Sequence, residues 1–313
     1  MLLGCSIPVA DIGTGPAVLR DYAQAAEGLG YSHLLAPDHV LGANPEAKTG
    51  LFASSIAASA SFNAGARRVG TTTNAYHDPF VLYGFLTGCT RTIGFAVGVL
   101  ILAQRQAVLV AKQAASLDEL SGGRLRLGIG VGWNEIEFVG LNENFHNRGR
   151  RSEEQVRVMQ ALWAEPHVTF AGEFHQLDDV GINPRPALGR VPIWFGGHAE
   201  ATFRRAAKYG DGIMPIVYPA GDAALGAFEK VRALTREAGR DPAQLGIEVW
   251  VSPGVGSEED WRREIGFWKK AGVTHITAHT TYVSDHHKRI AGRSAAAHLA
   301  AITRYRAAVA DLL

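Results

Sequence analysis

The sequence has very few cysteines: Cys5 and Cys89 are the two in 313 residues. Two thiols cannot build a disulfide framework or a four-cysteine zinc site. An excess of one charge is also missing, because 31 Lys and Arg residues nearly balance 30 Asp and Glu residues, for a net charge of +1. This balance argues against a general nucleic-acid binder or a polybasic membrane protein. We therefore expect neither nucleic acid nor a membrane as a partner.

Long apolar runs and targeting signals are missing as well. The longest apolar stretch, from Ile93 to Ala103, is shorter than the roughly 20 residues that a membrane-spanning helix needs. No Lys or Arg precedes Arg20, so the basic start of a secretory signal is absent. With so few cysteines, these features predict a cytoplasmic protein in a reducing compartment.

The chain does contain a regular alternation of short β-branched runs and longer alanine-rich segments of helical period. The short runs predict strands at 2–9, 33–37, 92–101, 124–131, 191–195, 211–216, 245–252 and 273–279. The longer segments predict helices at 16–28, 79–89, 107–120, 149–164, 199–208, 221–239, 257–271 and 294–312. Several strands are apolar on both faces, as expected when helices cover a parallel sheet.

Eight strand–helix units predict an α/β fold, a TIM (β/α)8 barrel with insertions, as a single domain over residues 1–313. The alternative is a doubly wound open sheet, but no G-x-G-x-x-G motif follows the first strand. Segments 39–78 and 165–190 are longer than ordinary loops. The first follows a strand, which places it on the catalytic face of a barrel. The second holds a predicted hairpin, HVTFAGEFHQL, and follows a helix, which directs it toward the opposite rim.

A polar pair, Asp38-His39, stands at the C-terminal end of the second predicted strand. In a barrel, such strand ends face the active site. His39 could serve as a general acid, a hydrogen-bond donor to a cofactor or a metal ligand, or it could be an ordinary loop histidine. Because no H-x-H, H-E-x-x-H or carboxylate-rich set accompanies it, we expect no metal site.

Glycines interrupt the third and fourth predicted strands. Gly98 stands among bulky residues, which indicates either close approach of a ligand or a packing accommodation. Gly128, Gly130 and Gly132 alternate along the next strand and would leave one face bare for a flat ring, although Gly128 could also give clearance to a neighbouring strand. Trp133 follows them, either as a pocket wall or as a packing residue at the barrel rim.

A glycine turn, Gly196-Gly197-His198, joins the fifth strand to its helix. Backbone N–H groups at such a turn, together with the positive end of the helix dipole, can bind a phosphate. The basic run around Arg148 and Arg150 could bind phosphate or carboxylate groups, or it could be a solvated surface.

At this point the residues resemble a known family. The segment VGVLILAQRQAVLVAKQAASLDELSGGRLRLGIGVGWNEIEF is similar to the luciferase-like monooxygenase superfamily. The segments RGRRSEEQVRVMQALW, GINPRP and VPIWFGGHAEATFRRAAKYGDGIMP resemble its actinobacterial branch of deazaflavin-dependent oxidoreductases. The resemblance extends from Ile7 to about Gly272. It implies a luciferase-like barrel, a flavin or deazaflavin at the C-terminal strand ends, and a homodimer.

The resemblance also implies roles for particular residues. A non-proline cis peptide bond would fall at Gly98-Val99 and support the cofactor ring, and Gly196-Gly197 would bind its phosphate. The residues expected to bind the cofactor are Gly98, Val99, Gly130, Gly132, Gly196, Gly197 and His198.

In the related sugar-phosphate dehydrogenases, a pair corresponding to Asp38-His39 is catalytic, so Asp38 and His39 are the expected catalytic residues. Those enzymes carry an acidic residue after the fourth strand, where this sequence has Trp133. This difference argues against sugar-phosphate oxidation. Trp133 and Ile7 are expected to line the substrate pocket.

The implied function is hydride transfer between the deazaflavin coenzyme F420 and a small organic substrate. The acidic tail of that cofactor would favour a basic channel, for which the candidates are Arg67, Arg68, Arg148 and Arg185. The nearest alternative is an FMN-dependent luciferase-like monooxygenase that uses reduced flavin and O2. More remote alternatives are a metal-dependent barrel hydrolase using His39 and His198, and a non-catalytic cofactor-binding protein.

Overall fold

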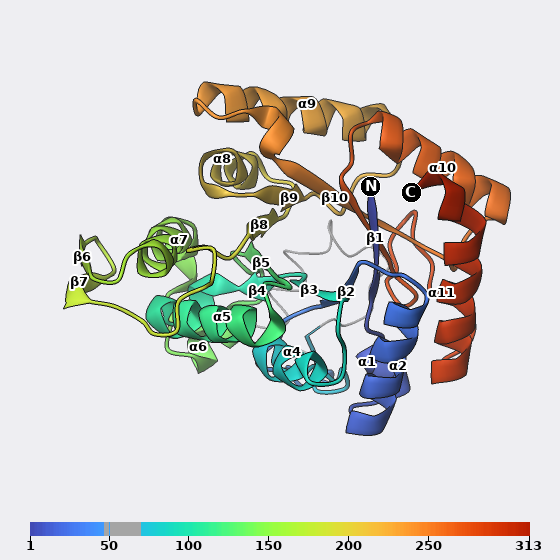
Figure 1. Cartoon of the computed structure of the whole chain (residues 1–313), viewed down its shortest axis with the longest axis horizontal. Coiled ribbons are helices and arrows are strands. Elements are labelled where there is room, and N and C mark those ends of the chain that lie inside the picture. The colour runs from blue at the N-terminus through green and yellow to red at the C-terminus, as the bar shows by residue number, and fades with distance from the viewer. Residues whose placement is uncertain (47–49, 51–69) are drawn as a thin grey trace.

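The computed structural model describes residues 1–46, 50 and 70–313. Its centre is a closed ring of parallel strands surrounded by helices (Figure 1). The barrel strands are β1 (Leu2–Ser6), β2 (His33–Ala36), β3 (Gly94–Val97) with β4 (Leu100–Ile101), β5 (Leu125–Gly130), β8 (Ile193–Gly196), β9 (Gly212–Met214), β10 (Gly246–Val251) and β11 (His275–Ala278). Pairing of β3 with β5 and of β1 with β11 closes the ring. The eight-stranded barrel predicted from the sequence is confirmed.

The helices cover the outside of this barrel because each buries one apolar stripe against the strands. They are α1 (Val9–Ile12), α2 (Pro16–Gly28), α4 (Pro79–Thr87), α5 (Ala107–Ser121), α6 (Glu135–Gly140), α7 (Arg148–Ala164), α8 (Glu200–Tyr209), α9 (Asp222–Glu237), α10 (Glu258–Lys270) and α11 (Ala295–Val309). Short 3-10 helices are η1 (Leu102–Gln104), η2 (Phe145–Asn147), η3 (Pro242–Gln244) and η4 (Ala310–Leu312).

Several helix ends follow local signals in the sequence. Asp78 caps α4 by accepting hydrogen bonds from two backbone N–H groups, while Pro79 occupies the first helical position. Ser257 and Asp260 form a capping box at the start of α10. Gly122 ends α5 in the left-handed conformation, with φ of 69°.

The N-terminal end of the barrel is filled by side chains. Trp194 of β8 occupies space left by Gly212 and Gly246, where an added Cβ would lie 2.3 Å from the indole ring. Beside it, Arg126 stacks on Trp194 at 4.4 Å and forms an ion pair of 2.5 Å with the fully buried Glu248. Because this end is packed, a ligand site belongs at the opposite, C-terminal end of the strands.

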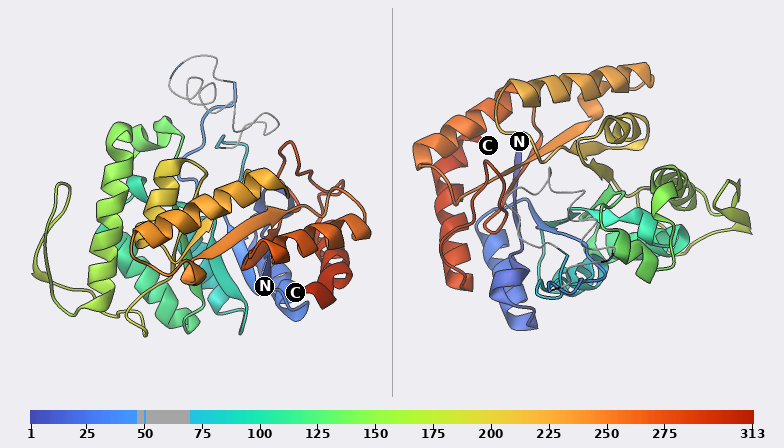
Figure 2. Two further views of the ribbon diagram at one scale, coloured as in Figure 1. Left: turned by 90° about the horizontal axis from the view of Figure 1, so that it is seen from above. Right: turned by 180° about the vertical axis from the view of Figure 1, so that it is seen from behind.

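The segments that adjoin residues 47–69 leave the barrel at this C-terminal end (Figure 2, left). Residues 39–46 and 70–78 meet there through hydrogen bonds between Ala43 and the stretch Gly70–Thr72. The described residues of the first insertion therefore lie at the C-terminal ends of the strands, and the catalytic role of this end stays a prediction.

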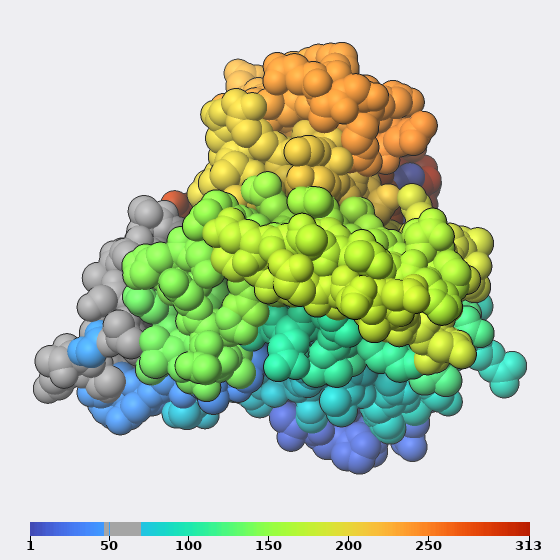
Figure 3. All heavy atoms as spheres, turned by 90° about the vertical axis from the view of Figure 1, so that its left-hand side faces the viewer, coloured from blue at the N-terminus to red at the C-terminus, as the bar shows by residue number. Residues whose placement is uncertain are grey.

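The predicted hairpin is also confirmed, as β6 (Val168–Ala171) paired antiparallel with β7 (Gln176–Val180). The hairpin is not confined to the opposite rim, which is where the sequence directed it. Its turn reaches Glu154 in the first half of α7, and its atoms form a yellow-green band across this side of the molecule (Figure 3). Within the described part of the chain, no helix has the length and apolar character that crossing a membrane requires.

Candidate active site

The C-terminal ends of the strands bring most of the expected site residues to one mouth of the barrel. Asp38 and His39 follow β2, Val99 interrupts the third strand, and Trp133 follows β5. Gly196 ends β8 on the other side of Val99. Ile7 follows β1 but is only 5% exposed, so it lies beneath the surface of this mouth.

The Asp38 carboxylate binds Arg105 and a backbone N–H group. One of its carboxylate oxygens accepts a hydrogen bond from Arg105 at 2.8 Å, and the other accepts from the Ile101 N–H at 3.1 Å and from Arg105 at 3.3 Å. Arg105 also binds Asp78, the cap of α4, at 2.9 Å. The Asp38 side chain is 1% exposed. This carboxylate therefore ties the ends of the second and third barrel strands to α4.

His39 instead faces an acidic residue, Glu137, that was not among the expected site residues. Its Nδ1 atom lies 3.3 Å from Oε2 of Glu137 in α6. The other oxygen of Glu137 accepts hydrogen bonds from the N–H groups of Val40 at 2.9 Å and Leu41 at 3.3 Å. Burial alone would raise the pKa of Glu137, but these hydrogen bonds and His39 lower it below its usual value. An acidic residue thus does follow the fourth barrel strand, four positions after Trp133.

Aromatic and amide groups surround the His39 ring. The ring of Tyr76 lies 4.8 Å from it, and Trp133 approaches edge-on at 6.4 Å. The side-chain amide of Asn134 is buried and has no hydrogen-bond partner for either polar atom among the described residues. A buried amide without partners is costly, which favours a ligand that supplies them.

The glycines around Val99 do not leave a bare face, contrary to the expectation from sequence. A Cβ at Gly130 would lie 2.7 Å from one methyl group of Val99, and a Cβ at Gly196 would lie 2.5 Å from the other. At Gly128 an added Cβ would meet the Val97 carbonyl oxygen, so this glycine gives clearance to a neighbouring strand. The missing side chains therefore let Val99 pack down between β5 and β8.

The third barrel strand and the turn at Gly132 have unusual backbone conformations. The peptide bond Gly98-Val99 is cis, as the resemblance implied. Gly132 has a φ of 75°, and a Cβ there would lie 2.6 Å from Ile101. Gly132 therefore serves a tight turn after β5, and the space above it is occupied by Ile101.

The glycine turn before α8 offers fewer amides than its sequence suggests. The N–H of Gly197 donates to the Met214 carbonyl at 3.2 Å. Ala199 stands at the N-cap of α8, and no side chain caps this helix. The N–H groups of Thr202 and Phe203 donate to the Ala199 carbonyl. An anion would therefore meet the N–H groups of Glu200 and Ala201, just after the exposed His198.

One of the candidate arginines, Arg148, stands at the start of α7 and is close enough to Arg205 of α8 for the two charges to interact. Arg148 stacks on the Phe145 ring at 3.7 Å and donates to the Gly132 carbonyl at 3.3 Å. Burial lowers the pKa of Arg148, while the charge of Glu135 partly offsets this effect. Arg185 instead donates to the Ala164 carbonyl, and the candidates Arg67 and Arg68 lie outside the described residues.

A second aromatic group at this mouth was not expected from the sequence. Trp250, near the end of β10, lies 4.0 Å from the ring of His279, which follows β11. Tyr282 packs edge-on against Trp250 at 5.1 Å. Burial lowers the pKa of His279 to about 3, and neither its Nε2 atom nor the Trp250 indole nitrogen has a partner among the described residues. Their places in the sequence could have indicated this group, because Trp250 and His279 stand near the C-terminal ends of the predicted strands 245–252 and 273–279.

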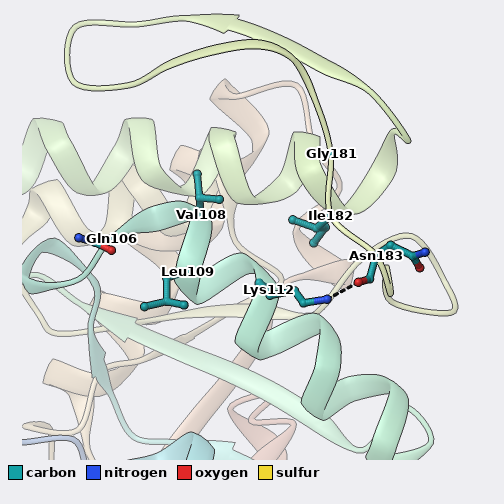
Figure 4. A pocket seen from close by; sticks show the side chains of 7 residues that line it. All are labelled: Gln106, Val108, Leu109, Lys112, Gly181, Ile182 and Asn183. Carbon is teal, nitrogen blue, oxygen red and sulfur yellow. Dashed lines mark hydrogen bonds between the residues drawn. The ribbon is translucent and has the colours of Figure 1, made fainter.

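A groove of about 520 Å³ lies elsewhere, on the outside of the barrel between α5 and the segment after β7 (Figure 4). It is lined by Gln106, Val108, Leu109, Lys112, Gly181, Ile182 and Asn183. The Lys112 ammonium group, its one charged group, donates to the Asn183 carbonyl. The groove therefore lacks the chemistry found at the barrel mouth. Nowhere in the described residues do three His, Cys, Asp or Glu side chains gather in a way that could hold a metal ion.

A parallel barrel with a histidine, a carboxylate and aromatic rings at its C-terminal mouth defines an enzyme of the TIM-barrel type. The model of the luciferase-like monooxygenase family matches residues 8–311. The chain belongs to this family. It spans about three fifths of the length of the first curated relatives that it matches.

Relatives and neighbouring structures agree with this assignment. An uncharacterised protein of Mycobacterium tuberculosis is 34% identical over 188 residues, which cover 59% of this chain and 61% of that protein. The FMNH(2)-dependent dimethylsulfone monooxygenase of Pseudomonas fluorescens is 38% identical over 109 residues, 34% of this chain and 30% of that one. An F420-dependent secondary alcohol dehydrogenase, solved with an F420-acetone adduct, has the same fold, with a TM-score of 0.73, 17% identity and 98% coverage of both chains.

Proposed function

We propose that this protein transfers a hydride between coenzyme F420 and a small organic substrate with a hydroxyl or carbonyl group. The observation that carries the proposal is the His39 ring, which lies at the barrel mouth with its Nδ1 atom held by a buried carboxylate. Oxidation of an alcohol requires a base for the hydroxyl proton, and reduction of a carbonyl requires an acid. A histidine held in this way suits both directions.

The residues present fit a flavin-type cofactor. Val99, packed between Gly130 and Gly196, would support the ring. The uncapped start of α8 and Arg148 would bind the phosphate and acidic tail. The unpartnered amide of Asn134 would hydrogen-bond a polar ring or substrate edge. When bound, the deazaflavin supplies or accepts the hydride.

The alternative is an FMN-dependent monooxygenase. It is favoured by the names of two partial relatives, the dimethylsulfone monooxygenase and a pyrimidine monooxygenase that is 33% identical over 174 residues. The neighbouring structures do not separate the two candidates, because an F420-dependent alcohol dehydrogenase and a monooxygenase cover 98% and 97% of this chain. The His39 arrangement favours the deazaflavin-dependent reaction, because alcohol oxidation needs a base.

The cofactors can be separated by titrating the protein with F420 and with FMN in turn and following fluorescence. We expect micromolar binding of F420, at least about tenfold weaker binding of FMN, and reduction of F420 by secondary alcohols. Arg148→Ala should weaken F420 binding, whereas the matched change of Arg150, which is exposed and paired with Glu173, should not. Binding of FMN alone, with oxygen consumption on addition of reduced FMN, would establish the monooxygenase instead.

A further inference from the structure

We propose that Glu137, and not the adjacent Asp38, is the residue that positions His39 for proton transfer. Glu137 would accept the Nδ1–H of the imidazole and leave Nε2 as the nitrogen that exchanges a proton with substrate. The inference rests on the proposed function for the reaction, but the state of the His39 ring can be measured without any cofactor.

The Asp38 carboxylate already has hydrogen-bond partners other than His39. Both of its carboxylate oxygens accept hydrogen bonds from Arg105, and one also accepts from the Ile101 N–H. The Arg105 guanidinium neutralises its charge at 2.8 Å. Asp38 therefore fixes the backbone from which His39 projects, while the structure gives no hydrogen bond between the two side chains.

The second step is that Glu137 is held in a single orientation. It is 1% exposed, and its Oε1 atom is fixed by the Val40 and Leu41 N–H groups that directly follow His39. This leaves Oε2 for the imidazole, 3.3 Å away. A carboxylate that accepts Nδ1–H fixes the tautomer and stabilises the imidazolium that forms when Nε2 takes a proton.

The third step is that the other groups around His39 do not compete for Nδ1. Burial raises the pKa of Tyr76 to about 12, so this neighbour stays a neutral phenol. Trp133 approaches the ring edge-on and carries no charge. Among the described residues, Glu137 is therefore the charged group that contacts the ring.

The direct test is ¹⁵N NMR of the chain of residues 1–313 with ¹⁵N-labelled histidine and no cofactor, with His39→Gln used to identify the His39 signals. We expect neutral His39 to carry its proton on Nδ1. In Glu137→Gln the side-chain oxygen still accepts from Val40 and Leu41, but the amide NH2 faces Nδ1, so the proton should move to Nε2. An Nε2–H tautomer in the native protein would overturn the proposal, even if Glu137→Gln failed to fold.

Turnover gives the second measurement. Glu137→Gln should lower kcat about 100-fold, with KM, cofactor affinity and melting temperature little changed, and Glu137→Asp should recover part of the loss. In a His39→Ala background the same change should cost nothing further, since its effect acts through the imidazole. Glu135→Gln, on the same helix, is the matched control. An equal loss in both backgrounds would show a structural role only, whereas absence of turnover with any cofactor would refute the proposed function and leave the NMR result to decide this inference.

Discussion

At the scale of single residues, His39 combines features that rarely occur together in a loop histidine. Its side chain is 11% exposed, it lies against two aromatic rings, and a buried carboxylate holds one ring nitrogen. None of these contacts is needed to close the barrel, because the strand ends nearby are tied by Asp38 and Arg105.

Replacement of His39 by Ala should therefore strongly lower turnover while the protein keeps its cofactor. We expect kcat to fall at least about 100-fold, the range for loss of a general acid or base, with a change in cofactor affinity below about twofold. Steady-state kinetics and fluorescence titration measure the two quantities. His146→Ala, at an 81% exposed side chain, is the control, and unchanged turnover in His39→Ala would remove His39 from proton transfer.

Gly196 provides a test of the packing around Val99. An added methyl group at Gly196 would lie 2.5 Å from Val99, so Gly196→Ala should displace Val99 and destabilise the protein by about 1–3 kcal/mol. Gly226→Ala, in the middle of α9 with open space around the added atom, should instead stabilise it slightly. Denaturant unfolding compares the two; equal stability of Gly196→Ala and the parent would contradict this account of the mouth.

The sequence predicted which strand ends carry the site but not which side chains meet there. Asp38 and His39 were expected to be catalytic because a corresponding pair is catalytic in the related sugar-phosphate dehydrogenases, yet the two side chains bind different neighbours, Arg105 and Glu137. Glu137 was missed because its contact with His39 joins residues 98 positions apart. The glycines of β5 and β8 were recognised, but the Val99 side chain that fills their space is visible only after the strands pair.

At the scale of elements, one buried carboxylate of α7 binds the turn of the hairpin β6–β7. Glu154 of α7 accepts hydrogen bonds from the N–H groups of Glu173, Phe174 and His175, at 2.7, 2.8 and 2.7 Å, and from the His175 ring at 2.8 Å. Burial would raise the pKa of Glu154, but these donors lower it. The turn thus binds α7 as a nest of amides binds an anion.

Glu154→Ala should release this turn without disturbing the barrel. We expect limited proteolysis to cut between residues 171 and 176 at least about tenfold faster, because three backbone N–H groups lose their acceptor. Cofactor affinity should stay the same, since the hairpin lies on the outer side of α7. Glu154→Gln, which keeps one acceptor oxygen, should show an intermediate rate, and an unchanged cleavage pattern in Glu154→Ala would show that other contacts hold the hairpin.

The helices were the most predictable elements. The strong signals at Pro16, Asp78-Pro79 and Ser257 place the starts of α2, α4 and α10 within one residue of the predicted bounds. The short helices α1 and η1 were not predicted, because one turn of helix after a strand leaves too few residues for a periodic pattern.

At the scale of the whole molecule, buried neutral histidines make the fold sensitive to acid. Burial lowers the pKa values of His275 and His279 to about 3 and of His287 to about 4. In the unfolded chain each would take a proton near its ordinary value of about 6.5. The unfolded state therefore binds more protons below this pH, and the free energy of unfolding falls as the pH drops from about 6.5 toward 4.

His279→Phe should reduce this acid sensitivity, because it keeps a ring against Trp250 and removes a group that titrates only on unfolding. Between pH 7.5 and 5.0 the loss of unfolding free energy should shrink by about 2 kcal/mol relative to the parent. Urea unfolding at the two pH values measures the difference. His146→Asn, at an exposed position, should leave the loss unaltered, and the same loss in His279→Phe and the parent would show that His279 is accessible to protons in the folded state.

The packed N-terminal end of the barrel has a consequence for kinetics. Since Trp194, Arg126 and Glu248 close that end, everything that reacts must arrive and depart through the same opening. Product must leave before the next substrate molecule can bind, so product should act as a competitive inhibitor with respect to substrate.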